Sequence, residues 1–191
     1  MRRLPTQLDG PILLEPEVHG DERGFFSETY RRNVYEAAGI AGEFIQDNHS
    51  RSGRNIARGM HFQIGRGAAK LVRCGRGAIV DVVVDLRRGS PTFGEWEAFR
   101  LDEENLHQLY CPVGFAHGFV VVGAVADVMY KCSAYYDESI ERGIAYDDPD
   151  VAIEWPAGVE LQVSARDASA PRLREIEGEL PFVYEPALTA S

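Results

Sequence analysis

The sequence contains few cysteines, and they form no recognisable pair. Cys74, Cys111 and Cys132 are odd in number, far apart in the chain and without a C-x-x-C spacing. This pattern argues against a disulfide framework, which is typical of small secreted proteins. All three lie in apolar, strand-like segments, where a free cysteine behaves as a small hydrophobic residue. We therefore expect three reduced, buried thiols and a cytoplasmic protein.

Long apolar runs and an excess of basic residues are also missing. The apolar run at residues 12–14 is too short for a signal peptide or a membrane helix. The chain has 20 Lys and Arg residues and 30 Asp and Glu residues, for a net charge of −10. This balance argues against nucleic acid binding, because a phosphate backbone attracts a basic surface. A small anionic ligand stays compatible, because it needs only a local group of arginines.

No internal repeat, low-complexity tract or linker interrupts the 191 residues. The length suits one domain with a core of its own, and we predict a single domain over residues 1–191. One short helix is predicted over residues 31–39, where Gly39 supplies the stop signal. The tail after residue 156 is mixed, and residues 164–178 predict a loop that leads into a short helix.

Most of the remaining sequence predicts short β-strands separated by Gly, Pro and Asp turns. The clearest strand covers residues 77–87, in which Val82 and Val84 share one apolar face. Asp81 and Asp85 lie on the opposite face of the same strand. Further strands follow at spacings of about 8–12 residues, which is typical of β-sandwiches and barrels.

The stretch CPVGFAHGF refines this prediction. Its P-x-G-x-x-H pattern, formed by Pro112, Gly114 and His117, resembles the second signature of the cupins. Together with the strand-rich pattern, it predicts an all-β fold. The expected architecture is a cupin-type double-stranded β-helix (jelly-roll barrel) with a few short helices.

The close pair of histidines that binds metal in many cupins is missing. Such sites use two closely spaced histidines, a carboxylate and a later histidine, and imidazole suits most transition metals. Here His61 has no histidine two residues away, and His49 is twelve positions upstream. A site built from His61, His117 and one carboxylate is short of ligands, so we expect no metal. A metal-dependent cupin enzyme stays as an alternative.

The stretch NIARGMHFQ, residues 55–63, places a cation and a titratable base on one strand. Arg58 and His61 are three residues apart, so they point to opposite faces of a regular strand unless a bulge intervenes. Gly59, which lies between them, is the expected place for an irregularity. With it, both side chains would serve one ligand.

Polar residues occupy many strand positions that would be apolar in a barrel with a plain core. Burying them without a ligand would be costly, so they predict a polar pocket inside the barrel. These residues are Gln46, Asn48, Arg58, His61, Gln63, Lys70, Asp81, Gln108, His117, Tyr130 and Lys131.

Three residues of this pocket form a set suited to proton transfer. His61 is a base, Tyr130 is a proton donor and Lys70 is a cation. A base removes a proton next to a carbonyl, a cation stabilises the enolate oxygen, and an acid returns a proton. If acid and base lie on opposite faces of the substrate, the carbon is inverted without a metal or a redox cofactor. The residue types alone leave epimerisation as one reading, beside a non-catalytic binding module.

Seven segments between about residue 5 and residue 172 resemble the dTDP-4-dehydrorhamnose 3,5-epimerase family, in the same order. The resemblance implies an isomerase, usually a homodimer, that acts without metal or other cofactor. Its substrate would be a nucleotide-linked 4-keto-6-deoxyhexose (dTDP-4-dehydro-6-deoxyglucose) in deoxysugar biosynthesis of the rhamnose type. The segments are DERGFFSETY, FIQDNHSRS, ARGMHFQ, KLVRCGRGAIVDVVVDLRRGSPTFGEW, CPVGFAHGF, MYKCSAYYDESIERGIAYDDPDVAIEWP and SARD.

The resemblance also implies catalytic roles. His61 matches the general base, Tyr130 the general acid and Lys70 the cation near the keto oxygen. Asp167 matches the carboxylate that orients the base, and such a partner would fix the tautomer of the ring. Asp81 matches another pocket carboxylate that competes for this position, and we favour Asp167.

Substrate contacts follow from the same resemblance. Tyr136 matches an aromatic residue that stacks on thymine, and His117 matches a pocket histidine that contacts substrate. Guanidinium groups suit a diphosphate. In the family some contacts come from the neighbouring subunit, so each site would be completed across a dimer interface. The expected substrate-binding residues are Arg23, Glu28, Gln46, Asp47, Asn48, Arg58, Asp81, His117, Tyr136, Glu141 and Arg166.

Three departures from the family pattern leave the exact reaction open. Residues 64–69 form a short segment without prolines, and Tyr146 stands where a tryptophan is common. The end of the chain also differs from the rhamnose-pathway enzymes. Relatives from antibiotic-sugar and glycan pathways invert only C3 or only C5, and no motif in this sequence decides between these outcomes.

Overall fold

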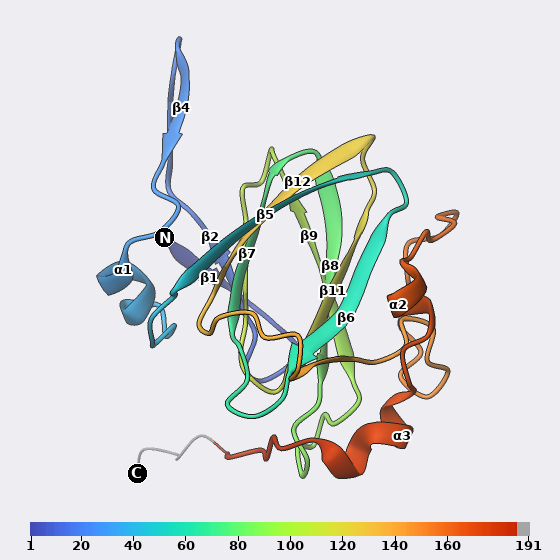
Figure 1. Cartoon of the computed structure of the whole chain (residues 1–191). Helices are drawn as coiled ribbons and strands as arrows, with labels where there is room; N and C mark the ends of the chain where they lie inside the picture. Colours follow the sequence, from blue (N-terminus) through green and yellow to red (C-terminus); the bar gives the residue numbers. More distant parts are fainter. Residues whose placement is uncertain (187–191) are drawn as a thin grey trace.

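The computed structural model describes residues 1–186 as two antiparallel β-sheets that face each other (Figure 1). The first sheet has the order β1 (Arg2–Leu4), β2 (Ile12–Glu15), β10 (Gln108–Cys111), β7 (Lys70–Arg76), β12 (Val125–Cys132) and β5 (Gln46–Gly53). The second has the order β13 (Glu141–Gly143), β6 (Ala57–Gln63), β11 (Phe115–Val121), β8 (Ala78–Asp85) and β9 (Trp96–Asp102). This arrangement confirms the predicted all-β fold of the cupin type with a few short helices.

The remaining elements are short. A hairpin of β3 (Val18–Asp21) and β4 (Gly24–Ser27) stands off the body at the upper left of Figure 1. The helices are α1 (Arg32–Ala37), α2 (Ala165–Ala168) and α3 (Leu173–Ile176), and the 3-10 turn η1 (Glu177–Glu179) follows α3. None of the helices in residues 1–186 is long and apolar enough to cross a membrane.

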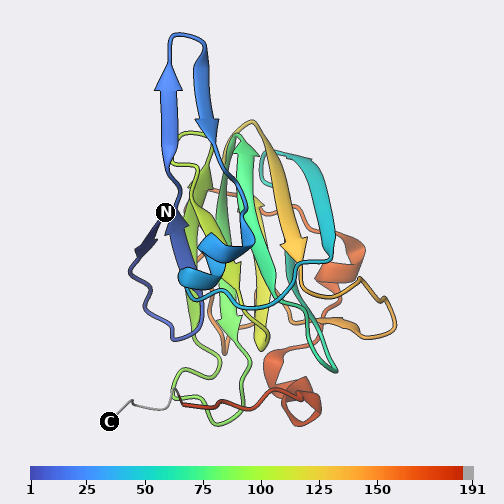
Figure 2. The ribbon, with the colours of Figure 1, turned by 90° about the vertical axis from the view of Figure 1, so that its left-hand side faces the viewer.

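Three clusters of buried apolar residues hold these layers together. The first lies between the sheets and includes Val83 and Val128. In the second, Leu173, Leu180 and other residues of the C-terminal segment cover the outer face of the second sheet. The third cluster lies under α1, on the outer face of the first sheet. Figures 1 and 2 show α1 on one side of the sheets and α2 and α3 on the other.

Strand β8 is buried on both faces because the C-terminal segment covers the second sheet. Val82 and Val84 pack into the outer cluster, as the apolar face of this strand predicted. Asp81 and Asp85 lie on the opposite face, and neither is exposed to solvent. Each has partners: Asp85 accepts hydrogen bonds from the side chain of Arg87, among others, and Asp81 contacts a histidine. Both carboxylates are therefore buried and paired with side chains, so this face of β8 is not exposed to solvent.

The helix predictions are confirmed in part. The helix expected over residues 31–39 is α1, which ends before Gly39. Gly39 has a φ of +94°, a backbone conformation that favours glycine. Residues 164–178 form two short helices rather than a loop and one helix. The β3–β4 hairpin was not predicted. Cys74, Cys111 and Cys132 are free and buried, as expected.

Two residues predicted for the interior pocket lie on the outer face of the first sheet instead. Gln108 accepts a hydrogen bond of 3.0 Å from the hydroxyl of Tyr35 on α1. The Lys131 ammonium lies 2.9 Å from a carboxylate oxygen of Asp47, also on the outside. The predictions for Gln108 and Lys131 were wrong because a polar residue on a strand can serve a covering helix or a surface ion pair instead of a pocket.

Strand β6 departs from regular geometry next to Gly59. His61 lies opposite His117 of β11, and Arg58 lies opposite Phe119, so three steps along β6 match two steps along β11. Such a bulge changes the face to which the following side chains point. Arg58 and His61 consequently line the same cleft, which confirms the predicted irregularity.

Gly59 also allows the two strands to approach closely. Its φ of +136° is rare for residues with a side chain. A Cβ at this position would lie 2.5 Å from Cα of Gly118 and 3.0 Å from the carbonyl oxygen of His117. Backbone atoms cannot yield as a flexible side chain does, so only glycine fits here.

We expect Gly59→Ala to lower the free energy of unfolding by about 3 kcal/mol, because backbone strain and overlap add. Gly42→Ala is the matched control, because Gly42 has a φ of +109° but open space around its Cβ position. That variant should lose about 1 kcal/mol. Urea unfolding of both variants measures the difference, and equal losses would contradict the close approach at Gly59.

Candidate active site

A cleft of about 640 Å³ opens between the two sheets, next to their edge strands β5 and β13. The first sheet contributes Lys70 and Tyr130, and the second contributes Arg58 and His61. The segment of α2 closes one side. Nine of the predicted site residues line this cleft: Arg58, His61, Lys70, His117, Tyr130, Tyr136, Glu141, Arg166 and Asp167.

His61 is paired with Asp167 inside the cleft. Nε2 of the ring lies 2.7 Å from Oδ1 of Asp167, whose side chain is almost fully buried. An ionised carboxylate only accepts hydrogen bonds, so Nε2 carries the donated proton and Nδ1 keeps a free lone pair. The favoured partner, Asp167, is therefore the one found in the structure, and Asp81 is not.

The surroundings of His61 favour its neutral form. Burial lowers the pKa of His61 below its ordinary value, and the nearby charge of Lys70 acts in the same direction. The hydrogen bond to Asp167 acts in the opposite direction and offsets part of this effect. At neutral pH the ring is therefore an uncharged base whose orientation is fixed by a carboxylate.

The short helix α2 holds Asp167 in place. The Ser164 hydroxyl caps this helix and accepts a hydrogen bond of 3.1 Å from the backbone N–H of Asp167. The preceding residues run beside the start of β6, where the backbone of Ala57 donates to the carbonyl of Gln162 at 2.9 Å. The backbone N–H of Gly59 lies 3.4 Å from Oδ2 of Asp167.

Tyr130 and Lys70 occupy the opposite wall of the cleft. Burial raises the pKa of Tyr130 above its ordinary value, so the phenol keeps its proton at neutral pH. The ammonium of Lys70 donates a hydrogen bond of 3.3 Å to the backbone carbonyl of His61. An acid and a cation thus face the base across one space.

A second histidine–carboxylate pair lies at the cleft, and only its histidine lines the space. Nε2 of His117 lies 2.8 Å from Oδ1 of Asp81, and both side chains are buried. His117 reaches the cleft, whereas Asp81 lies behind it and does not line the space. The prediction of Asp81 as a pocket carboxylate is therefore corrected: it supports His117 instead.

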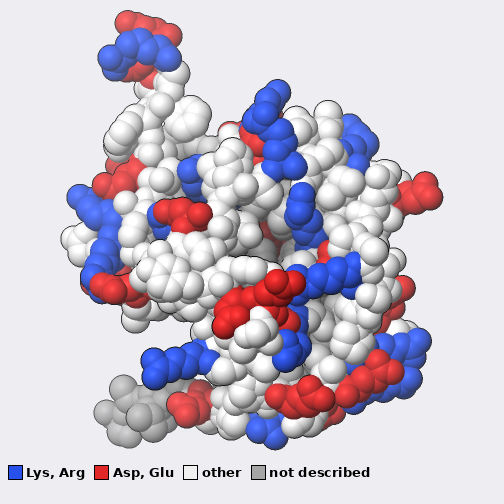
Figure 3. All heavy atoms as spheres, in the orientation of Figure 1, with Lys and Arg blue, Asp and Glu red and all other residues white. Residues whose placement is uncertain are grey.

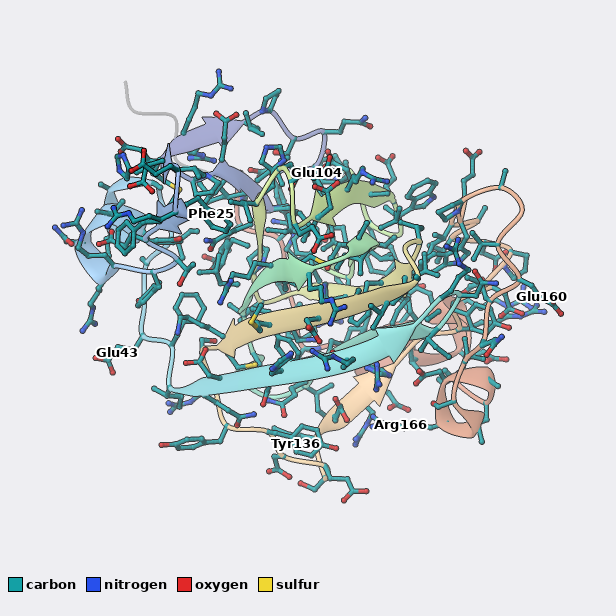
Figure 4. The ribbon with its side chains drawn as sticks, turned by 90° about the horizontal axis from the view of Figure 1, so that it is seen from above. Phe25, Glu43, Glu104, Tyr136, Glu160 and Arg166 are labelled. Carbon is teal, nitrogen blue, oxygen red and sulfur yellow. The ribbon has the colours of Figure 1, made fainter. Side chains whose placement is uncertain are left out.

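Charged and aromatic residues surround the mouth of the cleft. The guanidinium of Arg58 donates to the Ser52 hydroxyl at 3.0 Å. Arg166 forms an ion pair of 2.6 Å with Glu141. Figure 4 shows Tyr136 and Arg166 close to each other on this side of the molecule. Tyr136 is half exposed, so one face of its ring is available for stacking.

Gln46 and Asn48 lie in a smaller recess that adjoins the cleft and shares His61 and Lys70 with it. The amide of Gln46 holds this region together, because its oxygen accepts a hydrogen bond of 2.8 Å from the backbone of Tyr136. Both residues thus lie near the predicted site, beside its base and its cation.

Three predicted site residues lie away from the cleft in this chain. Asp47 points to the outer face of the first sheet. Arg23 is paired with Asp21 at the tip of the hairpin, where residues of both charges gather in Figure 3. Glu28 follows the hairpin and pairs with Arg31. Figure 4 shows Phe25 of the hairpin far from Tyr136 and Arg166.

Sequence reasoning missed Ser52, Gln162 and Ser164, which position the functional side chains. A signal existed for Ser164, because Ser-x-x-Asp at residues 164–167 is a typical start of a helix. No comparable local signal marked Ser52 or Gln162, whose partners become neighbours only through the fold.

No group of three or more His, Cys, Asp and Glu side chains in the described part of the chain is arranged to hold a metal ion. His61 and His117 each contact a carboxylate of their own.

Comparison with known proteins identifies the family. The model of the dTDP-4-dehydrorhamnose 3,5-epimerase family matches residues 5–175. The dTDP-4-dehydrorhamnose 3,5-epimerase of Salmonella typhimurium is 47% identical over 172 residues, which are 89% of this chain and 94% of that protein. The dTDP-4-dehydrorhamnose 3-epimerase of Streptomyces niveus is 42% identical over 92% of this chain and 85% of its own length.

A solved structure agrees with these matches. It is the dTDP-6-deoxy-D-glucose-3,5-epimerase of Legionella pneumophila in complex with dTDP-4-keto-L-rhamnose, with a TM-score of 0.93 and 45% identity. The match covers 96% of this chain and 98% of that one. The fold and the matches define an isomerase-class enzyme. The chain belongs to the dTDP-4-dehydrorhamnose 3,5-epimerase family.

We expect Asp167→Asn to lower the pKa of His61 further, because the carboxylate that stabilises the protonated ring is lost. Titration of the ring by NMR measures this, with Asp147→Asn, an exposed carboxylate, as the control. An unchanged pKa of His61 in Asp167→Asn would show that the pair does not hold the ring in solution.

Proposed function

We propose that this protein epimerises dTDP-4-dehydro-6-deoxyglucose at C3, at C5 or at both carbons, in deoxysugar biosynthesis. The observation that carries the proposal is the His61–Asp167 pair of 2.7 Å, which faces Tyr130 and Lys70 across one cleft. Base and acid come from different sheets, so they approach a bound sugar ring from opposite sides. Inversion requires this arrangement.

In the proposed reaction, Nδ1 of His61 takes the proton from a carbon next to the C4 ketone. The electrons of the broken C–H bond form an enolate, and the ammonium of Lys70 stabilises its oxygen. Tyr130 then donates a proton to the same carbon from the other face. One C–H bond breaks and one forms, so no net oxidation occurs, and the chemistry needs no metal or redox cofactor.

The nucleotide would bind at the mouth of the cleft. Arg58 and Arg166 offer guanidinium groups to the diphosphate, and Tyr136 offers an aromatic face to thymine. The small recess with Gln46 and Asn48 adds amide groups beside the base. Contacts of these amide and guanidinium groups with the nucleotide would favour a nucleotide-linked sugar over a free one.

We also propose a homodimer in which each site is completed by the partner subunit, with one domain over residues 1–191 and a cytoplasmic location. Arg23 and Glu28 do not line the cleft of their own chain, and they pair with Asp21 and Arg31 instead. They lie on or beside a projecting hairpin whose Phe25 and Phe26 are 63% and 69% exposed. Exposed aromatic residues of this kind are typical of interaction surfaces. Residues 187–191 lie outside the described part.

The proposal is tested by incubating the protein with dTDP-4-dehydro-6-deoxyglucose in deuterated water and following the C3 and C5 protons by NMR. We expect exchange with inversion. Exchange with inversion at both carbons would indicate a 3,5-epimerase. Exchange at one carbon would indicate a monofunctional enzyme, as the name of the Streptomyces niveus relative describes. No exchange at either carbon by folded protein would overturn the substrate assignment.

His61→Asn should lower the exchange rate by about 10³-fold with nucleotide affinity retained.

Mixing two defective variants tests the shared site. His61→Asn removes the base, and Arg23→Ala removes a contact that we expect the partner to supply. In a randomly reassorted dimer mixture, about a quarter of the sites carry neither change, so about a quarter of the activity should return. A mixture that stays as inactive as its components would contradict completion of the site across the interface.

A further inference from the structure

Glu141 and Arg166 form an ion pair of 2.6 Å beside the catalytic pair. Arg166 is the residue immediately before Asp167, on the same short helix. We propose that Glu141 is a positioning residue: through Arg166 it holds α2, and with it Asp167, against His61. This inference rests on the proposed function, because it concerns the base of that reaction.

The contacts form a closed ring. His61 on β6 contacts Asp167 on α2 at 2.7 Å. The neighbouring Arg166 contacts Glu141 on β13. Strand β13 pairs with β6 in register, with Gly143 opposite His61. The pairing of β6 with β13 thus fixes His61 and Glu141 relative to each other, and α2 is held between these two residues.

Backbone bonds attach the segments before and after helix α2, at Gln162 and at Pro171, so the side chains of α2 decide how the helix itself lies against the sheets. It spans four residues, and two of them, Ala165 and Ala168, carry no polar side chain. Arg166 and Asp167 are therefore the two side chains of α2 that can bond to the sheets. Losing the contact of Arg166 leaves Asp167 as the remaining side-chain contact of α2 with β6, through His61 and the backbone N–H of Gly59.

The position of Glu141 fits this role better than a direct contact with a diphosphate. Its side chain is only 13% exposed, whereas that of Arg166 is 52% exposed. A largely buried carboxylate requires a cation, and it would repel an anionic diphosphate. Arg166 can hold Glu141 with one part of its guanidinium and leave the remainder for the nucleotide.

Several groups surround His61, and they determine how its titration is interpreted. Glu141 and Asp167 favour the protonated ring, whereas Lys70 disfavours it. The positive charge of Arg166 must disfavour it as well. The charged and titratable groups that line the cleft with His61, from every element around it, are Arg58, Lys70, His117, Tyr130, Tyr136, Glu141, Arg166 and Asp167.

Two variants separate positioning from simple charge effects. Glu141→Gln removes an anion, and charge alone would lower the pKa of His61. Arg166→Gln removes a cation, and charge alone would raise it. If the ion pair positions Asp167, both variants lower the pKa, because both loosen the carboxylate that stabilises the protonated ring. NMR titration of the His61 ring, assigned with His61→Asn, measures this without turnover.

Activity provides the second measurement. We expect Glu141→Gln to lower kcat by about tenfold with little change in KM, because a misplaced catalytic group slows the chemical step. The acidic limb of its pH profile should move to lower pH, since the base stays neutral further down. The variant with both substitutions should be no slower than the slower single one, because one contact is lost in either case.

Glu138→Gln is the matched control, because Glu138 is an exposed acid three residues before Glu141. It should change neither the titration nor the rate. A higher KM with unchanged kcat and unchanged titration in Glu141→Gln would overturn the inference and leave Glu141 as a nucleotide contact. A raised pKa in Arg166→Gln would also overturn it. If no sugar is epimerised, the titration still decides about positioning, so the two proposals fail separately.

Discussion

The hydrogen bond between His61 and Asp167 is the interaction on which the site depends. It joins residues that are 106 positions apart in the chain. Two features of the fold make it possible. The bulge at Gly59 turns His61 toward the cleft, and the C-terminal segment covers the outer face of the second sheet and places α2 beside β6. The bulge thus sets the direction of the His61 ring, and the C-terminal segment supplies the carboxylate of Asp167 that orients the ring.

In the proposed reaction the two sheets supply different groups to the cleft. The second sheet carries both histidines, and each has its own buried or nearly buried carboxylate. The first sheet carries Tyr130 and Lys70. Burial acts on the two sides differently: it lowers the pKa of His61 and raises the pKa of Tyr130. One physical cause, removal from water, thus yields a neutral base and a protonated acid at the same pH.

The sequence predicted much of this site, and its errors share a cause. Alternation along a strand shows which residues share a face, but not which face points inward. Tyr130 and Lys131 are neighbours on β12, and the fold turns the first inward and the second outward. Gln108 was placed in the pocket because it is polar on a strand, yet it binds Tyr35 under α1.

The sequence by itself determined the all-β class, the buried and unpaired state of the three cysteines, the helix that ends before Gly39 and the family. These depend on local patterns and on order along the chain, which a linear string contains. Tertiary structure decided that Asp167, rather than Asp81, holds His61, and that Asp81 supports His117 instead. It also decided which polar strand residues face the cleft. The reason is physical: a hydrogen bond selects its partner by distance and direction, and residues 36 to 106 positions apart acquire these only when the sheets pack.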